Sequence, residues 1–302
     1  MDLAAHLPRV RLGTLPTPLE RGPLLPGGAR LWVKRDDLTG LGMGGNKVRK
    51  LELLCGAALA EGATCLVTVG AGQSNHCRAT AAAGAVLGLP VHLVLGGHPP
   101  PQLTGNQLLS ALFDATLHFT GTDDWDLLEA VRERMVVELR DSGERPYSIP
   151  IGGSTPLGAV GFALAHAELM DQTRVAGVTP RAVVHATSSG GTHAGLVAGR
   201  ALARAEGAVV GELVPVGVAK GVLADPGRVR ELARDCLSLL GRPGAPIADG
   251  DISVVSGLMG ADYAAPTAEA DAAIIAAARF GGWVLDRVYT GKAFAGLLAL
   301  AA

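Results

Sequence analysis

The sequence predicts an α/β protein with two interwoven domains, each an open parallel sheet covered by helices on both faces. Short apolar runs alternate with longer helical segments along the whole chain, which is typical of parallel sheets. A length of 302 residues accommodates one large domain or two smaller ones. The clearest loops, at 99–101 and 241–250, are too short to be mobile linkers, so we expect interwoven domains.

Apolar runs bounded by turn residues are the strand candidates. They are 30–34, 65–69, 91–95, 115–119, 147–149, 182–186 and 213–218. Longer segments with helical spacing lie between or after them. They are 47–61, 74–87, 105–112, 125–140, 155–170, 191–206, 227–240, 267–279 and 291–300. Ser74 is well placed as an N-cap, because a serine hydroxyl accepts a hydrogen bond from the first turn of a helix.

Composition and charge exclude several classes of protein. The chain is 48% hydrophobic but only 4% aromatic, which indicates a core of Ala, Val and Leu. The formal net charge of -2, without a basic stripe, argues against nucleic-acid binding. The most apolar stretch, 79–97, is interrupted by Gly84, Gly88, Pro90 and His92, so it reads as a helix followed by a strand and not as a membrane span.

The cysteines and the N-terminus both indicate a cytoplasmic protein. Cys55, Cys65, Cys77 and Cys236 have no C-x-x-C spacing and are expected to be reduced thiols. The first residues lack the charged-then-apolar pattern of a signal peptide.

Lysine is scarce, and Lys47 lies where a polar turn enters a predicted helix. Segment 44–50 reads Gly-Gly-Asn-Lys-Val-Arg-Lys, and the chain holds 5 lysines against 21 arginines. A primary amine can lose its proton and attack a carbonyl, whereas a guanidinium cannot. Lys47 is therefore a candidate for a Schiff base with a carbonyl cofactor. The alternative is that Lys47 and Lys50 are ordinary solvated residues of a first turn.

Two glycine-rich junctions each join a predicted strand to a predicted helix. Segment 69–76 reads Val-Gly-Ala-Gly-Gln-Ser-Asn-His, and segment 185–195 reads His-Ala-Thr-Ser-Ser-Gly-Gly-Thr-His-Ala-Gly. Ligands of open parallel sheets bind beyond the carboxyl ends of the strands, and helix N-termini favour anions. The second junction suits one phosphate monoester. The alternative is a simple strand-to-helix turn with a hydroxyl N-cap.

Other kinds of site have less support. The first junction lacks the third glycine of a dinucleotide fingerprint, and the acidic residue expected about twenty positions later is missing. No P-loop signature occurs. His76, His185 and His193 lack the i, i+4 pairing of a helical zinc site, so no metal is expected. The spacing around Ser74 assembles no Ser/His/Asp triad.

Several segments together carry a resemblance to a known family. They read Lys-Arg-Asp-Asp-Leu at 34–38 with Gly-Gly-Asn-Lys-Val-Arg-Lys-Leu-Glu at 44–52, Gln-Ser-Asn-His at 73–76, Tyr-Ser-Ile-Pro-Ile-Gly-Gly-Ser at 147–154 with Pro-Leu-Gly-Ala at 156–159, the loop ending at Gly195, and Val-Tyr-Thr-Gly-Lys-Ala at 288–293. In this order they resemble the pyridoxal-phosphate enzymes of the 1-aminocyclopropane-1-carboxylate deaminase/D-cysteine desulfhydrase family, and its D-cysteine desulfhydrase branch most closely. The resemblance covers nearly the whole chain.

The resemblance implies an architecture, a cofactor and a set of site residues. The fold would be type II of the pyridoxal-phosphate enzymes, similar to the tryptophan synthase β subunit, with a small domain at 48–158 and a large domain formed by 1–47 and 159–302. The cofactor would be pyridoxal 5'-phosphate, and the protein would be a homodimer. The catalytic residues would be Lys47, which forms the Schiff base and moves the α-proton, Ser74, Tyr263 and Tyr289.

Cofactor and substrate contacts also follow from the resemblance. Besides Lys47, the cofactor-binding residues would be Lys50, Asn75, Ser188, Ser189, Gly190, Gly191, Thr192 and Thr290. Lys50 and the loop would hold the phosphate, Asn75 would hydrogen-bond the ring oxygen, and Thr290 would meet the pyridine nitrogen. The substrate-binding residues would be Ser74, Asn75 and His76. The alternative for Tyr289 is a buried aromatic whose hydroxyl is merely satisfied.

Thr290 directs the expected reaction. The deaminase branch carries Glu at this place, which favours a protonated ring and a strong electron sink. A neutral hydroxyl suits loss of a leaving group from the β-carbon. We therefore expect β-elimination on a small amino acid, foremost D-cysteine to pyruvate, hydrogen sulfide and ammonia.

Three other readings stay open. The protein could be a 1-aminocyclopropane-1-carboxylate deaminase or a sulfo-lyase acting on cysteate. A non-enzyme reading is a cofactor-binding protein with impaired turnover, because family members continue past this point into a further strand and turn, whereas this sequence ends at Ala302.

Overall fold

A computed structural model describes residues 3–302, and its chain forms two compact units. The first unit contains the described residues up to Thr17 together with Asp36–Gly161. The second contains Pro18–Arg35 and Phe162–Ala302. The chain thus passes from one unit to the other three times, the last time inside helix α5 (Pro156–Val175). The domain boundaries predicted at 48 and 158 stay a prediction.

The first unit is built on a parallel sheet with the strand order β5-β4-β3-β6. The strands are β3 (Cys65–Gly70), β4 (Val91–Leu95), β5 (Thr116–Phe119) and β6 (Pro146–Ile149). Every neighbouring pair is parallel, with Leu66 opposite Val91 and Leu93 opposite Leu117. The helices of this unit are α1 (Lys47–Ala60), α2 (Asn75–Leu87), α3 (Gly105–Leu112) and α4 (Trp125–Asp141).

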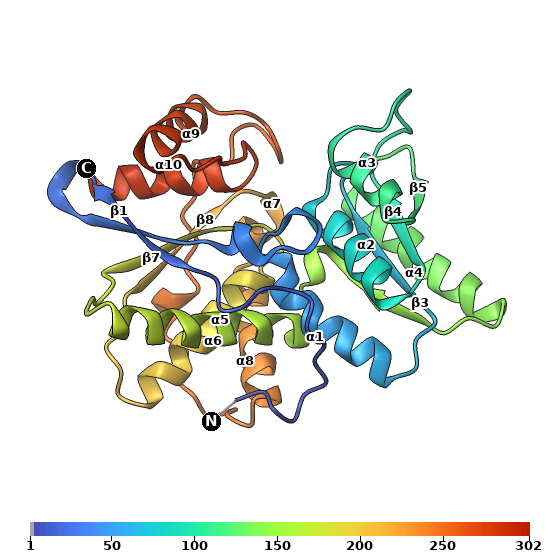
Figure 1. The fold of residues 1–302 in the computed structure, drawn as a ribbon, viewed down its shortest axis with the longest axis horizontal. Helices are drawn as coiled ribbons and strands as arrows, with labels where there is room; N and C mark the ends of the chain where they lie inside the picture. Colours follow the sequence, from blue (N-terminus) through green and yellow to red (C-terminus); the bar gives the residue numbers. More distant parts are fainter. Residues whose placement is uncertain (1–2) are drawn as a thin grey trace. The chain divides into compact units, whose positions relative to one another are not determined.

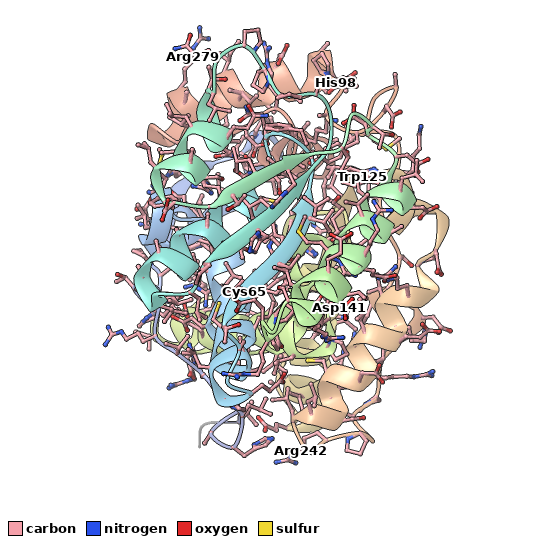
Figure 2. All side chains as sticks on the ribbon, turned by 90° about the vertical axis from the view of Figure 1, so that its right-hand side faces the viewer. Cys65, His98, Trp125, Asp141, Arg242 and Arg279 are labelled. Atoms are coloured by element: carbon pink, nitrogen blue, oxygen red, sulfur yellow. The ribbon has the colours of Figure 1, made fainter. Side chains whose placement is uncertain are left out.

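Alternating side chains of this sheet pack against helices on its two faces. Leu66 and Leu93 point to one face and lie in a cluster with apolar residues of α1 and α2. Val69 and Val94 point to the other face and pack against Leu128 of α4. Since successive strand residues face opposite ways, this division follows from the strand period of two. Figure 1 shows β3 and β4 between α2 and α4, and Figure 2 labels Trp125 and Asp141 at the two ends of α4.

The second unit contains two separate strand pairs. β1 (Leu19–Leu24) and β2 (Arg30–Lys34) are antiparallel, with an irregularity between Arg21 and Leu24. β7 (Ala182–Thr187) and β8 (Glu212–Gly217) are parallel, and Val255 forms an isolated parallel bridge with Val216. The helices are most of α5, α6 (Gly191–Ala205), α7 (Lys220–Ala224), α8 (Gly227–Leu239), α9 (Ala268–Gly281) and α10 (Thr290–Ala301).

Helix α10 organises the packing of the second unit. It packs on β7, β8 and α9, and its Ala293 lies in a cluster with Val216 and Val218. Trp283 closes a second cluster with Leu25 and with residues of β2, α9 and α10. Within the described chain, no helix is both long and apolar enough to cross a membrane. The parallel pairs flanked by helices are those of the predicted α/β class.

Candidate active site

Lys47 is the first residue of α1 and follows a turn that requires glycine. Gly44 has φ +72°, and a Cβ on it would lie 2.0 Å from the carbonyl oxygen of Asp37. No side chain other than hydrogen fits there without moving the backbone. The Lys47 amine donates to Asn46 Oδ1 at 3.1 Å. The turn therefore sets where the amine emerges from the helix.

A partly buried ion pair holds the same turn against α1. Arg49 donates from Nε to Asp36 Oδ2 and from Nη2 to Asp36 Oδ1, both at 2.8 Å. Thr17 adds a hydrogen bond to Asp36 Oδ1 at 2.9 Å, and the Gly45 N–H donates to the Asp36 carbonyl at 3.0 Å. Two parallel charge-assisted bonds constrain direction as well as distance. Asp36 and Arg49 thus position the backbone of Lys47 without belonging to the predicted site.

Lys50 lies one turn further along α1 and is buried. It is 1% exposed, and its amine donates to the Gly152 carbonyl at 3.0 Å. Burial, and to a lesser extent the charge of Lys47, hold the pKa of Lys50 well below its ordinary value. This amine is not an ordinary solvated lysine, and it is stabilised in its charged form by any anion placed beside it.

His76 is turned into the first unit and its tautomer follows from its neighbours. Thr68 Oγ1 donates its only proton to the Ile149 carbonyl at 2.9 Å, so it accepts from His76 Nε2 at 2.9 Å. Nδ1 is then the bare nitrogen, and within residues 3–302 it has no hydrogen-bond partner. Burial first, then the charges of Lys47 and Lys50, hold the pKa of His76 well below its ordinary value. His76 is a neutral, buried neighbour of the two lysines.

Ser74 and Asn75 stand where β3 passes into α2. Ser74 is the N-cap, since its Oγ accepts from the Cys77 N–H at 3.2 Å. Asn75 is the first helical residue, and its Oδ1 accepts from Asn106 Nδ2 at 2.9 Å. The capping role expected of Ser74 is therefore present. The contact between Asn75 and Asn106 has no counterpart in the sequence argument.

In the second unit, the predicted phosphate loop runs from the end of β7 into α6. Gly190 is the N-cap residue with φ +83°, and it has no side chain to fill the space before the helix. The predicted residues Ser188, Ser189, Gly190, Gly191 and Thr192 are thus brought together at a helix N-terminus. Beside them, Thr187 Oγ1 is buried and finds no partner in the described part of the chain. A helix N-terminus with a nearby unsatisfied hydroxyl suits an anion.

Two histidines lie at this loop, one on each flanking element. His185 of β7 and His193 of α6 have ring centroids 5.2 Å apart. Their four ring nitrogens are buried. Burial lowers the pKa of His185 to about 4 and holds that of His193 well below its ordinary value. Both imidazoles are therefore neutral at physiological pH.

The two predicted tyrosines are brought together. The hydroxyls of Tyr263 and Tyr289 are 2.5 Å apart, and their rings meet edge-on with centroids 6.2 Å apart. Tyr289 immediately precedes α10, whereas Tyr263 lies in an irregular segment before α9. One hydroxyl of such a pair donates and the other accepts. The tyrosine that donates in this pair therefore uses its hydroxyl proton in the bond to the other tyrosine.

Thr290 is held by a carboxylate that the sequence analysis did not consider. Its Oγ1 donates to Asp286 Oδ2 at 2.8 Å and accepts from the Asp286 N–H at 2.9 Å. Asp286 Oδ1 also accepts from the N–H groups of Val288 and Tyr289 at 2.7 and 2.6 Å. Asp286 therefore caps α10 and fixes the rotamer of Thr290.

These two groups of residues suit the parts of pyridoxal phosphate. The first unit supplies Lys47, the buried amine of Lys50, which donates to the Gly152 carbonyl and to no carboxylate of the described residues, and Asn75. The second unit supplies the α6 N-terminus with the unsatisfied Thr187 hydroxyl. An amine for the aldehyde and an anion cradle for the phosphate are the donor set that the cofactor requires.

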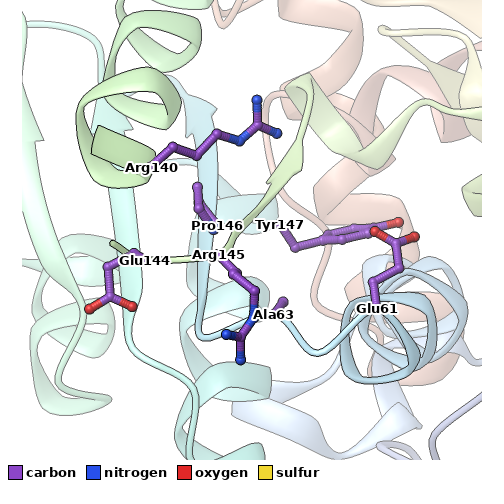
Figure 3. Close-up of a pocket in the computed structure, with 7 residues that line it drawn as sticks. All are labelled: Glu61, Ala63, Arg140, Glu144, Arg145, Pro146 and Tyr147. Carbon is purple, nitrogen blue, oxygen red and sulfur yellow. The ribbon is translucent and has the colours of Figure 1, made fainter. Parts of the chain in front are cut away.

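A cavity of about 310 Å³ lies elsewhere in the first unit (Figure 3). Its lining residues are Glu61, Ala63, Arg140, Glu144, Arg145, Pro146 and Tyr147. Pro146 and Tyr147 begin β6, so this cavity is at the amino end of the sheet. Ser74 and Asn75 follow the carboxyl end of β3, where ligands of parallel sheets bind. The cavity is thus not part of the candidate site.

Residues 10–302 match the family described as pyridoxal-phosphate dependent enzyme. The chain belongs to this family. The cofactor of this family is pyridoxal phosphate.

Named relatives match nearly the whole length of this pyridoxal-phosphate-dependent enzyme. A Klebsiella pneumoniae protein named D-cysteine desulfhydrase is 39% identical, and the match covers 97% of this chain and 88% of that protein. An Arabidopsis thaliana protein, named bifunctional D-cysteine desulfhydrase/1-aminocyclopropane-1-carboxylate deaminase, mitochondrial, is 37% identical over 95% of this chain and 72% of its own. A crystal structure described as an ACC deaminase homologue superposes with a TM-score of 0.89 at 36% identity, covering 99% of this chain and 88% of that one.

Sequence reasoning missed the residues that hold the site in place. Thr68, Asn106 and Asp286 hydrogen-bond predicted residues directly, whereas Asp36 and Arg49 hold the turn before Lys47. The only local signal was Asp286, which stands four residues before Thr290 at the start of a predicted helix, where a carboxylate caps N–H groups. The other contacts join segments distant in sequence and leave no pattern in it.

Proposed function

We propose that this enzyme cleaves D-cysteine, with water, to pyruvate, hydrogen sulfide and ammonia. The observation that carries the proposal is the 39% identity, over 97% of the chain, to a protein named D-cysteine desulfhydrase. The neutral hydroxyl of Thr290, at the place where the deaminase branch has Glu, supports β-elimination over ring opening. When bound, pyridoxal phosphate supplies the electron sink for the negative charge that develops at the substrate α-carbon.

Residues of the first unit are proposed to do the proton chemistry. Lys47 attaches the cofactor through its amine and then moves the α-proton of the substrate, since a lysine freed from its cofactor is a base at that position. The Ser74 hydroxyl and the first N–H groups of α2 orient the substrate carboxylate. His76 is proposed to line the substrate side as a neutral ring, because protonation there would place a third cation beside Lys47 and Lys50.

The phosphate and ring contacts are proposed as follows. Lys50 and the Ser188, Ser189, Gly190, Gly191 and Thr192 segment hold the phosphate, with Thr187 as a further donor suggested by its unsatisfied hydroxyl. Asn75 donates to the ring oxygen, and Thr290 meets the pyridine nitrogen. Tyr263 and Tyr289 share one proton-donating bond and are proposed to assist the leaving group as a pair.

A second candidate is deamination of 1-aminocyclopropane-1-carboxylate, because the Arabidopsis relative is named for both activities. Thr290 donates to the carboxylate of Asp286, and an acidic group near this place is what the deaminase branch has, so this contact supports the alternative more than the sequence alone does. Cysteate sulfo-lyase activity and cofactor binding without turnover are the remaining outcomes. We further propose domains at 48–158 and 1–47 with 159–302, a homodimer and a cytoplasmic location.

A parallel substrate assay separates these functions. Purified enzyme saturated with pyridoxal phosphate is incubated with D-cysteine, L-cysteine, cysteate and 1-aminocyclopropane-1-carboxylate, while keto acid, sulfide and sulfite are measured. We expect pyruvate and sulfide in equal amounts from D-cysteine. Keto acid from the cyclopropane substrate alone, or sulfite from cysteate alone, would replace the proposal with the corresponding alternative.

Thr290→Glu tests the argument for β-elimination. A carboxylate at 290 changes the charge at the pyridine end and repels Asp286, so we expect kcat/KM with D-cysteine to fall about tenfold or more, which is about 1.4 kcal/mol of barrier. Thr290→Ser is the matched control, because it keeps the hydroxyl that bonds Asp286. Unchanged β-elimination in Thr290→Glu contradicts the argument.

A further inference from the structure

Asn106 lies outside every predicted site segment, yet it touches the loop that carries Ser74 and Asn75. It is the second residue of α3, and it is 31 residues from Asn75 along the chain. Its side-chain amide donates twice, at 2.9 Å to the Gln73 carbonyl and at 2.9 Å to Asn75 Oδ1. Its backbone N–H donates to Gln73 Oε1 at 2.8 Å. Three hydrogen bonds thus join Asn106 to Gln73 and Asn75, the two residues on either side of Ser74.

The direction of these bonds is determined by backbone groups. The Gln73 carbonyl can only accept, so the Asn106 atom that contacts it must be the NH₂ group. The same NH₂ group faces Asn75, and therefore the Asn75 atom that meets it must be the oxygen. In the same way the Asn106 N–H can only donate, so the Gln73 side-chain atom that it meets must be the oxygen, Oε1. The other side-chain atom, Gln73 Nε2, then donates to the Thr104 carbonyl at 3.1 Å.

The consequence falls on the other end of the Asn75 amide. With Oδ1 occupied by Asn106, Nδ2 is the group that Asn75 can offer to a ligand, and Nδ2 has no hydrogen bond to the described residues. Asn75 is therefore presented as a donor only. Left unconstrained, an asparagine amide could turn and present its oxygen instead, which would repel an anionic oxygen of a ligand.

The fold gives this contact little room to adjust. Gly105 has φ +53°, and a Cβ there would lie 2.6 Å from Gln73 Oε1. A Cβ on Gly72 would lie 3.0 Å from Gln107 Nε2. The positive φ disfavours any other residue at Gly105, and a side chain at either position would press on a glutamine amide, so the two segments lie close together around Asn106.

We propose that Asn106 is a positioning residue that locks the Asn75 amide with its NH₂ group toward the cofactor. The inference rests on the proposed function, in which Asn75 donates to the ring oxygen. Asn106 itself touches neither cofactor nor substrate in this account. Its effect passes through one hydrogen bond, so it should vanish when Asn75 is removed.

The test compares Asn106→Asp with Asn106→Ala. The carboxylate of Asn106→Asp has nearly the shape of the amide but no proton to donate, so it turns the Asn75 amide and exposes Oδ1. Ala only releases the amide. We expect the dissociation constant of pyridoxal phosphate from the apoprotein, followed by protein fluorescence, to rise about 10- to 100-fold in Asn106→Asp and less in Asn106→Ala. A role in loop packing alone predicts the reverse order, because Asp preserves the shape.

Gln102→Glu is the matched control for charge. Gln102 is exposed in the segment before α3 and is converted from amide to carboxylate in the same way. It should leave the affinity within about twofold. The melting temperature of each apoprotein separates folding defects from binding defects, and Asn106→Ala carries the test if Asn106→Asp does not fold.

A double-mutant cycle decides the mechanism. In an Asn75→Ala background, Asn106→Asp should change the affinity by less than about twofold, because its target is gone. Additive losses would overturn the proposed action through Asn75. If Asn75→Ala alone leaves cofactor affinity unchanged, the role of Asn75 and the inference on Asn106 both fall, while turnover of D-cysteine by the parent enzyme would still uphold the proposed function.

Discussion

At the scale of single residues, the lysines of α1 differ more than their spacing suggests. Lys47 and Lys50 stand three positions apart in one helix, but Lys50 is buried against the Gly152 carbonyl. A buried amine is unfavourable in its charged form unless an anion compensates it. Its pKa is displaced downward for this reason. Burial of the charged Lys50 amine therefore lowers the stability of the folded apoprotein, and an anionic ligand or an uncharged substitution at position 50 would relieve this penalty.

Lys50→Met separates the effect of the buried charge on apoprotein stability from its effect on cofactor affinity. Methionine fills a similar volume without a charge, so we expect the apoprotein to melt no lower than the parent. We expect the affinity for pyridoxal phosphate to fall about tenfold or more, because an ion-paired hydrogen bond to the phosphate is lost. Calorimetry of the apoprotein and a cofactor titration measure the two effects. Lower apoprotein stability together with unchanged affinity would show that Lys50 is structural.

Residue identities near the site were predictable only where the signal is local. Lys47 at a helix start and Ser74 as an N-cap can be read from neighbouring residues, and the structure has both helix positions. The roles assigned to them stay predictions.

Asn106 and Thr68 could not be predicted from the sequence, because each acts through a partner that the fold brings near. A single sequence holds no record of such pairings.

At the scale of elements, hydrogen bonds join α10 and the residue before it to the irregular segment before α9. Lys292 of α10 is 0% exposed and donates to the Met259 carbonyl. The segment that contains Met259 and Tyr263 has no regular structure and includes Ala264 with φ +62°. One buried amine thus ties an irregular segment to the helix that follows Tyr289.

Lys292→Met is expected to loosen this segment. Without the amine, the Met259 carbonyl loses its donor, and amide hydrogen exchange over 256–266 should become faster, with little change in α9. Lys220→Met is the matched control, because Lys220 forms an exposed ion pair with Asp262 of the same segment, and such pairs contribute little. Equal exchange in the parent and Lys292→Met would contradict this role, as would an equal acceleration in both variants.

Most elements agree with the prediction, and the exceptions have physical reasons. β2, β4 and α3 have the predicted bounds, and most others differ by one or two residues at their ends. β1 was not predicted, because its sequence, Leu-Glu-Arg-Gly-Pro-Leu, contains two charged residues, a glycine and a proline and shows no strand-like alternation. α5 continues five residues beyond its predicted end, because no glycine or proline stops it before Gly177.

At the scale of the whole molecule, buried neutral histidines link folding to pH. Burial first, and then Arg200, lower the pKa of His166 to about 4, and His185 is lowered to about 4 by burial. His76 and His193 are displaced in the same direction. In the unfolded chain these groups have pKa values of about 6.5. Below that pH the unfolded state binds more protons than the folded state.

The free energy of unfolding of the apoprotein should therefore decrease as the pH falls from about 6.5 toward about 4. Each such histidine contributes a slope of up to about 1.4 kcal/mol per pH unit. His185→Leu should reduce the slope by about this amount, whereas His98→Asn, at an exposed loop position, should not. Denaturant titrations at a series of pH values measure the slope. A slope unaltered in His185→Leu would contradict the assignment.

The α/β class and the alternation of strands and helices were predictable for the whole chain, because they depend on apolar periodicity. The assignment of segments to the two units was harder to predict from the sequence. Residues 18–35 belong to the second unit although residues on both sides belong to the first. Such excursions depend on which apolar surfaces meet, as when Trp283 packs with Leu25 and Leu31 of the N-terminal segment.

The attachment of pyridoxal phosphate to Lys47 is the central claim, and reductive trapping tests it most directly. The enzyme is saturated with pyridoxal phosphate, reduced with borohydride, digested and analysed by peptide mass spectrometry, with Lys47→Ala treated in parallel. We predict one phosphopyridoxyl group on the amine of Lys47 and none at that peptide in Lys47→Ala. An adduct on Lys50 or another lysine instead, or no adduct after saturation, would contradict the account.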